Sequence, residues 1–127
     1  MRRTDQRRAA VVALYQADAT GRRAPDLLDP AATDFTRELV DGVEAQCEQL
    51  DELIERHAEG WTLDRIAPLE RGIMRVALHE LLSRDDVPAE VAIDEAIEAA
   101  KELCGADAPG FVNGILGAVH REEVAAK

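Results

Sequence analysis

Apolar residues recur every three or four positions along most of this chain, which is the spacing of one face of an α-helix. Phe35, Leu39 and Val43 begin such a stripe, and Leu50 and Ile54 continue it. The pattern predicts five main helices, joined by one or two short helical turns: residues 4–20, residues 32–59, one from about 68 that stops before 85, one through 93–103, and one after 107. We therefore expect an all-α protein.

Residues typical of helix ends flank these segments. Thr4 and Asp107 are expected to cap the first and last helices with their side-chain oxygens. Gly21 follows the first helix, where a glycine often ends a helix in the left-handed conformation. Between the second and third helices, a short turn is expected to deliver Trp61 and Leu63 to the core.

The composition favours one soluble helical domain. The chain has 127 residues, of which 46% are apolar and 3% aromatic, enough to bury one core without metals or disulfides. The charged first residues lead into no leader-like apolar stretch, and no apolar run approaches the length of a membrane span. We expect a single domain in the cytoplasm.

Charge is distributed unevenly along the chain. The net charge is −11, yet residues 1–23 carry six arginines against two aspartates, and residues 24–127 have a net charge of −15. An acidic surface repels phosphate, so the start of the first helix is the candidate site for a nucleic acid. From charge alone, a solvated helix face explains these arginines equally well.

The histidines and cysteines lack the spacing of metal ligands. His57, His79 and His120 fall in three different predicted helices, where we expect them to be partly exposed. Cys47 and Cys104 are far apart within apolar stripes, so each is expected to be a small buried residue of a protein in a reducing compartment. We predict no metal site.

Residues 110–117 are rich in glycine but do not form a phosphate loop. No strand precedes them and no Lys-Ser or Lys-Thr follows, both of which that loop needs. Gly114 and Gly117 are instead expected to allow the close approach of a neighbouring helix. We find no nucleophile elbow or dinucleotide fingerprint, and predict neither a catalytic residue nor a cofactor.

Four stretches of the chain form a larger pattern. They are Arg7-Arg8 with the Ala-Leu-Tyr of residues 13–15; residues 69–81, LERGIMRVALHEL; residues 86–88, DVP, with residues 92–101, AIDEAIEAAK; and residues 111–116, FVNGIL. The last three, in this order and spacing, are the more specific. Together the stretches resemble the NusB family of bacterial transcription antitermination factors over nearly the whole chain.

The resemblance implies a fold and a function. The fold is an all-helical, NusB-like bundle of two small helical subdomains, at about residues 1–60 and 61–127. The function is RNA binding: with NusE, a protein of the small ribosomal subunit, such a factor binds the boxA element of nascent RNA. The complex joins NusA, NusG and RNA polymerase and suppresses premature termination, chiefly on ribosomal RNA operons.

The residue types at these positions fit RNA binding. Single-stranded RNA is held by arginine contacts to phosphate and by bases stacked on aromatic rings or guanidinium planes. The candidate RNA-binding residues are Arg2, Arg3, Arg7, Arg8, Tyr15, Lys101, Phe111 and Asn113. Packing in the core is the alternative for Tyr15 and Phe111, and helix capping is the alternative for Asn113.

The resemblance also supplies candidates for the protein partner. Glu70 and Asp107 occupy positions at which similar proteins approach NusE, and a basic ribosomal protein complements an acidic surface. Two other functions stay open. The chain is either a protein adaptor or homodimer with its arginines in the dimer interface, or the RNA-binding part of a ribosomal RNA methyltransferase. The latter is disfavoured because no cofactor-binding unit follows within 127 residues.

Overall fold

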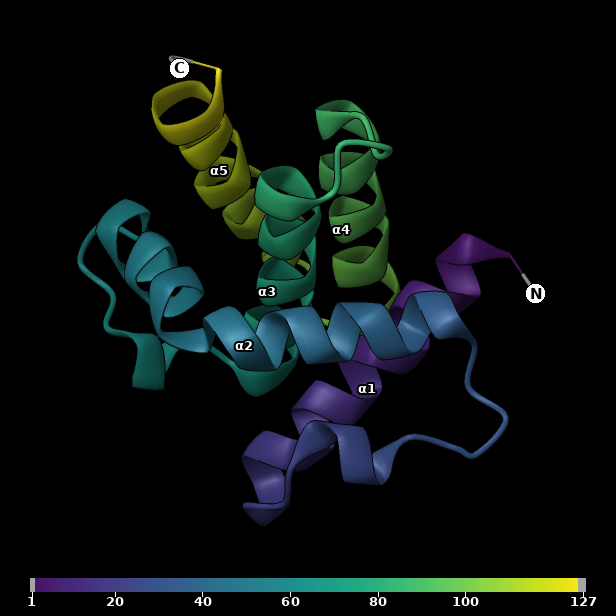
Figure 1. Ribbon diagram of the computed structural model, residues 1–127. Coiled ribbons are helices and arrows are strands. Elements are labelled where there is room, and N and C mark those ends of the chain that lie inside the picture. The colour runs from purple at the N-terminus through teal and green to yellow at the C-terminus, as the bar shows by residue number, and fades with distance from the viewer. Residues whose placement is uncertain (1, 126–127) are drawn as a thin grey trace.

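The computed structural model describes residues 2–125, which form helices joined by short turns, without a strand (Figure 1). The main helices are α1 (Arg3–Thr20), α2 (Asp34–His57), α3 (Pro68–Ser83), α4 (Ala89–Leu103) and α5 (Ala108–Val119). Shorter turns of helix are η1 (Ala24–Leu27), η2 (Leu63–Arg65) and η3 (His120–Val124). The all-α prediction is confirmed, and all five predicted helices are present.

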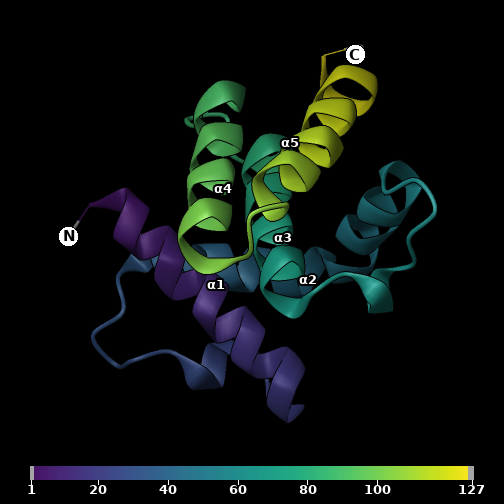
Figure 2. The same ribbon diagram turned by 180° about the vertical axis from the view of Figure 1, so that it is seen from behind.

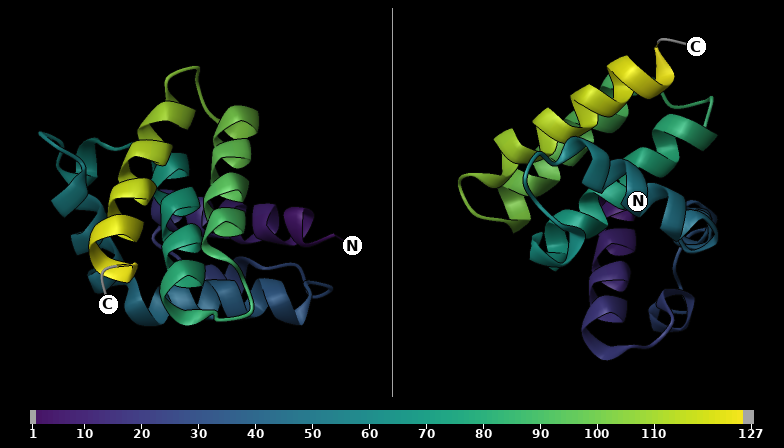
Figure 3. Two further views of the ribbon diagram at one scale, coloured as in Figure 1. Left: turned by 90° about the horizontal axis from the view of Figure 1, so that it is seen from above. Right: turned by 90° about the vertical axis from the view of Figure 1, so that its left-hand side faces the viewer.

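Helix α3 is the centre of the fold. It contacts α1, α2, α4 and α5. In Figure 1, and from behind in Figure 2, α3, α4 and α5 stand together while α1 and α2 cross beneath them. The same arrangement is seen from above in Figure 3. One core therefore includes residues from both halves of the chain, and the division into two subdomains stays a prediction.

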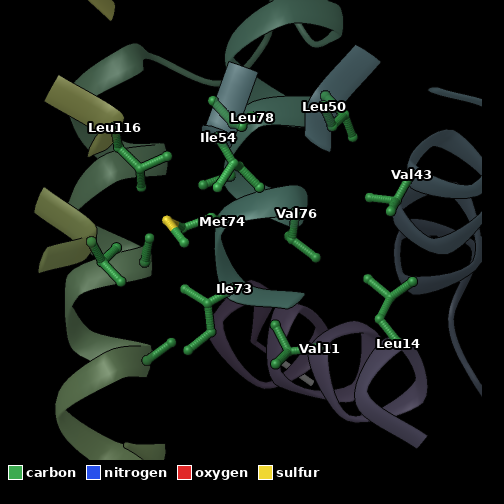
Figure 4. Packing of buried hydrophobic residues seen from close by; sticks show 14 of the residues in the cluster. Val11, Leu14, Val43, Leu50, Ile54, Ile73, Met74, Val76, Leu78 and Leu116 are labelled. Atoms are coloured by element: carbon green, nitrogen blue, oxygen red, sulfur yellow. The ribbon is translucent and has the colours of Figure 1, made fainter. Parts of the chain in front are cut away.

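The core forms where the apolar stripes of the helices converge on α3. Ile73 and Met74 of α3 are almost completely buried, as are Val11 of α1, Ile54 of α2 and Leu116 of α5 (Figure 4). Each such side chain contributes about 1.5–3 kcal/mol when it is fully removed from water. The helical periodicity of the sequence thus accounts for the packing of the core.

The helix ends agree only in part with the expected caps. Gly21 ends α1 in the left-handed conformation (φ 75°) and donates to the carbonyl of Ala17, as predicted. The cap expected from Thr4 is wrong, because α1 begins at Arg3 with Arg2 at its N-cap position, and the Thr4 hydroxyl donates to the Glu95 carboxylate of α4 at 2.9 Å. Asp107 lies at the start of α5 in a helical conformation (φ −84°, ψ −14°), which gives its carboxylate no capping hydrogen bond.

Helix α2 is distorted at Gln46 (φ −119°, ψ 15°), whose side-chain amide contacts His79 of α3. The Gln46 side chain donates to the Gly42 carbonyl at 3.3 Å and lies 3.2 Å from Nδ1 of His79. Nε2 of His79 lies 2.8 Å from Glu38. His79 is 2% exposed, so the expectation of partial exposure is wrong for this residue. Polar partners on α2 make its burial tolerable.

The glycines of α5 do not serve close helix packing. A Cβ atom at Gly114 would meet nothing within 4 Å beyond the adjoining backbone of its own helix, and one at Gly117 would meet only the Arg121 side chain. The expectation that they admit a neighbouring helix is therefore wrong. The close approach occurs instead at Gly42, where a Cβ would lie 2.1 Å from the His79 ring.

Both cysteines are free and half-buried, less enclosed than expected. Burial raises the pKa of the Cys47 thiol and of the Cys104 thiol, which keeps both protonated near neutral pH. Within residues 2–125, no helix combines the length and hydropathy needed to cross a membrane. No group of three or more metal-binding side chains gathers in that part of the chain.

Candidate nucleic-acid interface

The first turn of α1 presents two accessible guanidinium groups. The side chains of Arg2 and Arg3 are 82% and 48% exposed. Arg2 lies 3.8 Å from Asp5, and Arg3 lies 3.4 Å from Asp86 and 4.2 Å above the ring of Phe35. The positive end of the helix dipole adds to their charge. These two arginines are therefore well placed to contact an anion.

Arg7 has a different role from the one predicted. Its side chain is 6% exposed, and its Nε and Nη2 donate to the two carboxylate oxygens of Glu80 at 2.8 and 2.9 Å. Burial alone would lower the pKa of the guanidinium, but the hydrogen bonds and charge of Glu80 raise it. The guanidinium is not accessible to a phosphate. Arg7 instead ties α1 to α3 through a buried ion pair.

Arg8 and Lys101 lie where α1 meets the end of α4. The Arg8 side chain is 13% exposed and lies 3.4 Å from the carboxylate of Glu102, the residue after Lys101. Lys101 is 58% exposed and lies 3.2 Å from Glu98. Because ion pairs with exposed carboxylates contribute only about 0–1 kcal/mol, a phosphate group can replace these carboxylates.

The remaining RNA candidates are divided between two helices. Tyr15 lies on α1 and is 39% exposed, which does not fit the alternative of core packing. Asn113 is exposed on α5, whereas Phe111 of the same helix is half-buried and packs against the core. The structure thus places Phe111 and Asn113 on another helix from the arginines, and the eight candidates do not form one cluster.

Glu70 and Asp107 are far apart in the sequence but line the same cleft. An open cleft of about 280 Å³ separates the start of α3 from the start of α5, and both residues line it. Phe111 and Trp61 line the same cleft. A candidate for RNA binding therefore shares a cleft with both candidates for partner binding.

Trp61 was expected in the core, and that expectation is wrong. Its side chain is 48% exposed, and its ring meets the ring of Phe111 edge-on, with 5.8 Å between centroids. Gly60, with φ of 78°, turns the chain so that the Trp61 amide donates to the Ala58 carbonyl at 2.8 Å. Leu63 does pack against the core as predicted. The position of Trp61 directly after a glycine, outside any apolar stripe, is the signal for its exposure.

The carboxylates of the cleft make no ion pair within residues 2–125, although the exposed Arg65 also lines the cleft. The side-chain carboxylates of Glu70 and Asp107 accept no hydrogen bond from residues 2–125. Burial raises the pKa of Glu70. A half-buried carboxylate without a partner lowers stability, and a cation from another molecule would offset that cost.

The sequence of this chain is similar to that of known proteins along most of its length. The model of the NusB family matches residues 4–121. Transcription antitermination protein NusB of Saccharopolyspora erythraea is 46% identical over 126 residues, which cover 92% of this chain and 85% of that protein. The similarity therefore includes every main helix.

Solved structures give the same result for the fold. NusB of T. maritima matches 99% of this chain and 95% of its own, with a TM-score of 0.88 and 32% identity. A chain from the crystal structure of antitermination factors NusB and NusE in complex with dsRNA matches with a TM-score of 0.83 and 25% identity, over 94% of this chain and 96% of that one. From its sequence and its fold, this chain belongs to the NusB family.

Proposed function

We propose that this chain is a transcription antitermination factor that pairs with NusE and, with it, binds boxA-type single-stranded RNA. The complex would join NusA, NusG and RNA polymerase in the cytoplasm and suppress premature termination, chiefly on ribosomal RNA operons. The observation that carries the proposal is the match, over 94% of the chain, to a chain from a structure of NusB and NusE in complex with dsRNA. The family consists of antitermination factors rather than enzymes, so we assign the chain no catalytic step.

The RNA face is proposed to follow α1 and to continue across the end of α4. Arg2 and Arg3 offer exposed guanidinium groups, and Arg8 and Lys101 hold only exposed carboxylates that phosphate can displace. Tyr15 adds an exposed ring on the same helix as the arginines. Arg7 does not contact RNA in this proposal; its buried ion pair with Glu80 holds α1 in place against α3.

The partner face is proposed to be the cleft of Glu70 and Asp107. Its carboxylates are unpaired within the described chain, and residues 24–127 carry a large negative charge. Both features attract a basic protein such as a ribosomal protein. The acidic surface also disfavours RNA binding where no arginine or lysine is exposed.

Neutralising the arginines at the start of α1 is expected to weaken RNA binding and its dependence on salt. For the variant Arg2→Gln with Arg3→Gln, the loss of two phosphate contacts reduces the slope of log K against log salt by about 1.4, at about 0.7 per contact on a single strand. The measurement is a titration of labelled boxA RNA with the variant and NusE at several salt concentrations.

The other end of α1 offers a matched control. Arg22 and Arg23 are adjacent, exposed arginines just after α1, and no ion pair engages them within residues 2–125. Changing both to glutamine removes the same charge and is expected to leave the salt slope unchanged. If both double variants lower the slope equally, net charge rather than a defined α1 face governs binding. If neither double variant lowers the slope, the alternative of a protein adaptor or homodimer is favoured.

Reversing the charge of the cleft is expected to weaken NusE binding. For Glu70→Lys with Asp107→Lys, we expect at least about a tenfold loss of affinity, because opposed like charges cost several kcal/mol. Calorimetric titration with NusE measures it, with Glu48→Lys and Glu52→Lys on the exposed face of α2 as the control. Equal losses in both double variants would exclude the cleft as the partner site.

In the wild-type protein, the affinity for NusE should fall as the pH decreases through the raised pKa of Glu70, since the neutral acid no longer attracts a cation.

A further inference from the structure

Trp61 and Phe111 form a ridge between two open clefts. On one side lies the cleft of Glu70 and Asp107. On the other lies a cleft of about 400 Å³, which Trp61 and Phe111 also line, together with the end of α2 and the outer face of α5. We refer to it as the α5 cleft; its lining residues include His57, Glu59, Gly110, Gly114 and Arg121.

The Trp61 ring is both exposed and held in place. Phe111, which packs against the core, meets it at an interplanar angle of 66°. Such an edge-to-face contact restricts the orientation of the indole while leaving the rest of its surface free. The indole N–H has no hydrogen-bond partner among residues 2–125. Trp61 is therefore a preformed flat surface with an unused donor.

Helix α5 lines the α5 cleft with two glycines. Gly110 and Gly114 both lie within α5, and a Cβ at either position would meet nothing within 4 Å. A glycine inside a helix costs about 1 kcal/mol relative to alanine. No packing within the described chain offsets that cost here. A molecule that approaches the helix backbone closely would account for both glycines.

The α5 cleft offers a phosphate one cation, Arg121, with the exposed carboxylates of Glu59 and Glu122 nearby. Arg121 lines it, is exposed and has no ion pair within residues 2–125. Nδ1 of His57 lies 2.9 Å from the Glu122 carboxylate, whereas its buried Nε2 lies 3.5 Å from Glu123 and makes no hydrogen bond within the described chain. Glu59 is the opposing charge at the edge, and its side chain is exposed. The unpaired guanidinium repels a lysine or arginine from a partner and attracts a phosphate.

We propose that the α5 cleft binds one unpaired RNA base, stacked on Trp61 above Gly110 and Gly114, with the adjoining phosphate at Arg121. Aromatic stacking of bases beside a free guanidinium is the usual way in which single strands are held without pairing. The inference rests on the proposed RNA-binding function. It adds a contact on the opposite side of the Trp61–Phe111 ridge from the partner cleft, so that RNA and NusE occupy neighbouring sites.

The chain contains one tryptophan, so its fluorescence reports on this site directly. NusE is added first and boxA RNA second, with Trp61→Phe as the blank for emission from NusE. We expect quenching of the Trp61 emission on addition of RNA. If labelled RNA binds but the emission is unchanged, the inference fails and the proposed function stands. If the emission changes with NusE and not with RNA, the cleft belongs to the protein partner. If no RNA binds, both fail.

Variants test the same contact without fluorescence. Trp61→Ala is expected to lower RNA affinity about tenfold, which is the effect of losing one stacked base, whereas Trp61→Phe retains most of it. Gly114→Leu fills the cleft and should reduce affinity similarly, while Gly114→Ala leaves most of the space open and should not. The melting temperature is expected to stay unchanged in the Trp61 variants. NusE affinity is expected to stay unchanged in Gly114→Leu, because Gly114 does not line the cleft of Glu70 and Asp107. Wild-type RNA affinity in Trp61→Ala and Gly114→Leu would overturn the proposal.

Discussion

Replacing Arg7 by alanine is expected to lower the free energy of unfolding by about 3–5 kcal/mol. The change leaves the Glu80 carboxylate, whose side chain is 1% exposed, without its bidentate partner. A buried carboxylate without a counter-charge has lost its solvation and its hydrogen bonds together. Urea denaturation followed by circular dichroism measures the effect.

Two variants show that the effect comes from the buried pair. Arg3→Ala breaks a half-exposed ion pair with Asp86 and is expected to cost less than about 1 kcal/mol. Arg7→Met with Glu80→Met removes both charges and should recover much of the stability. If Arg7→Ala unfolds like the wild type yet no longer binds RNA, Arg7 contacts RNA directly and the structural role given to it here is wrong.

Replacing Gly42 by alanine is expected to destabilise the protein by about 1–3 kcal/mol, the usual range for an overpacked core. In most helices the same change is stabilising by up to about 1 kcal/mol. Here the new Cβ would lie 2.1 Å from the His79 ring. The ring has little room to move, because Glu38 and Gln46 hold its two nitrogens at 2.8 and 3.2 Å.

Gly114→Ala provides the matched comparison. Gly114 also lies within a helix, but its added Cβ has no neighbour within 4 Å. We expect this variant to be more stable than the wild type, so the two glycine-to-alanine changes should have opposite signs in thermal unfolding. A Gly42→Ala protein that melts at or above the wild-type temperature would contradict the packing of His79 against α2.

The helices could be predicted from the sequence because their determinants are local. The apolar spacing of residues 69–81 defines α3, and Gly21 marks the end of α1 by its left-handed conformation. The same reasoning failed where a distant residue decides the outcome. Arg7 is buried because Glu80 of another helix faces it, and His79 is buried because Gly42 leaves room for its ring.

The candidate site was predicted less completely than the fold. Residue type identified the arginines as RNA candidates, but only the structure separates accessible Arg2 and Arg3 from enclosed Arg7. Trp61 was expected to reach the core with Leu63 through a short helical turn, whereas the turn at Gly60 leaves it exposed. Exposure depends on how the helices pack together, which the hydrophobic pattern along one helix does not determine.

We propose that this chain and NusE together form one RNA-binding surface. The direct measurement is a titration of fluorescently labelled boxA RNA with the chain alone, with NusE alone and with an equimolar mixture, read by anisotropy. We predict that the mixture binds more tightly than either protein, and that a scrambled RNA of the same length binds more weakly. If the mixture binds no more tightly than NusE alone, the chain contributes no RNA-binding surface and the proposed function is wrong.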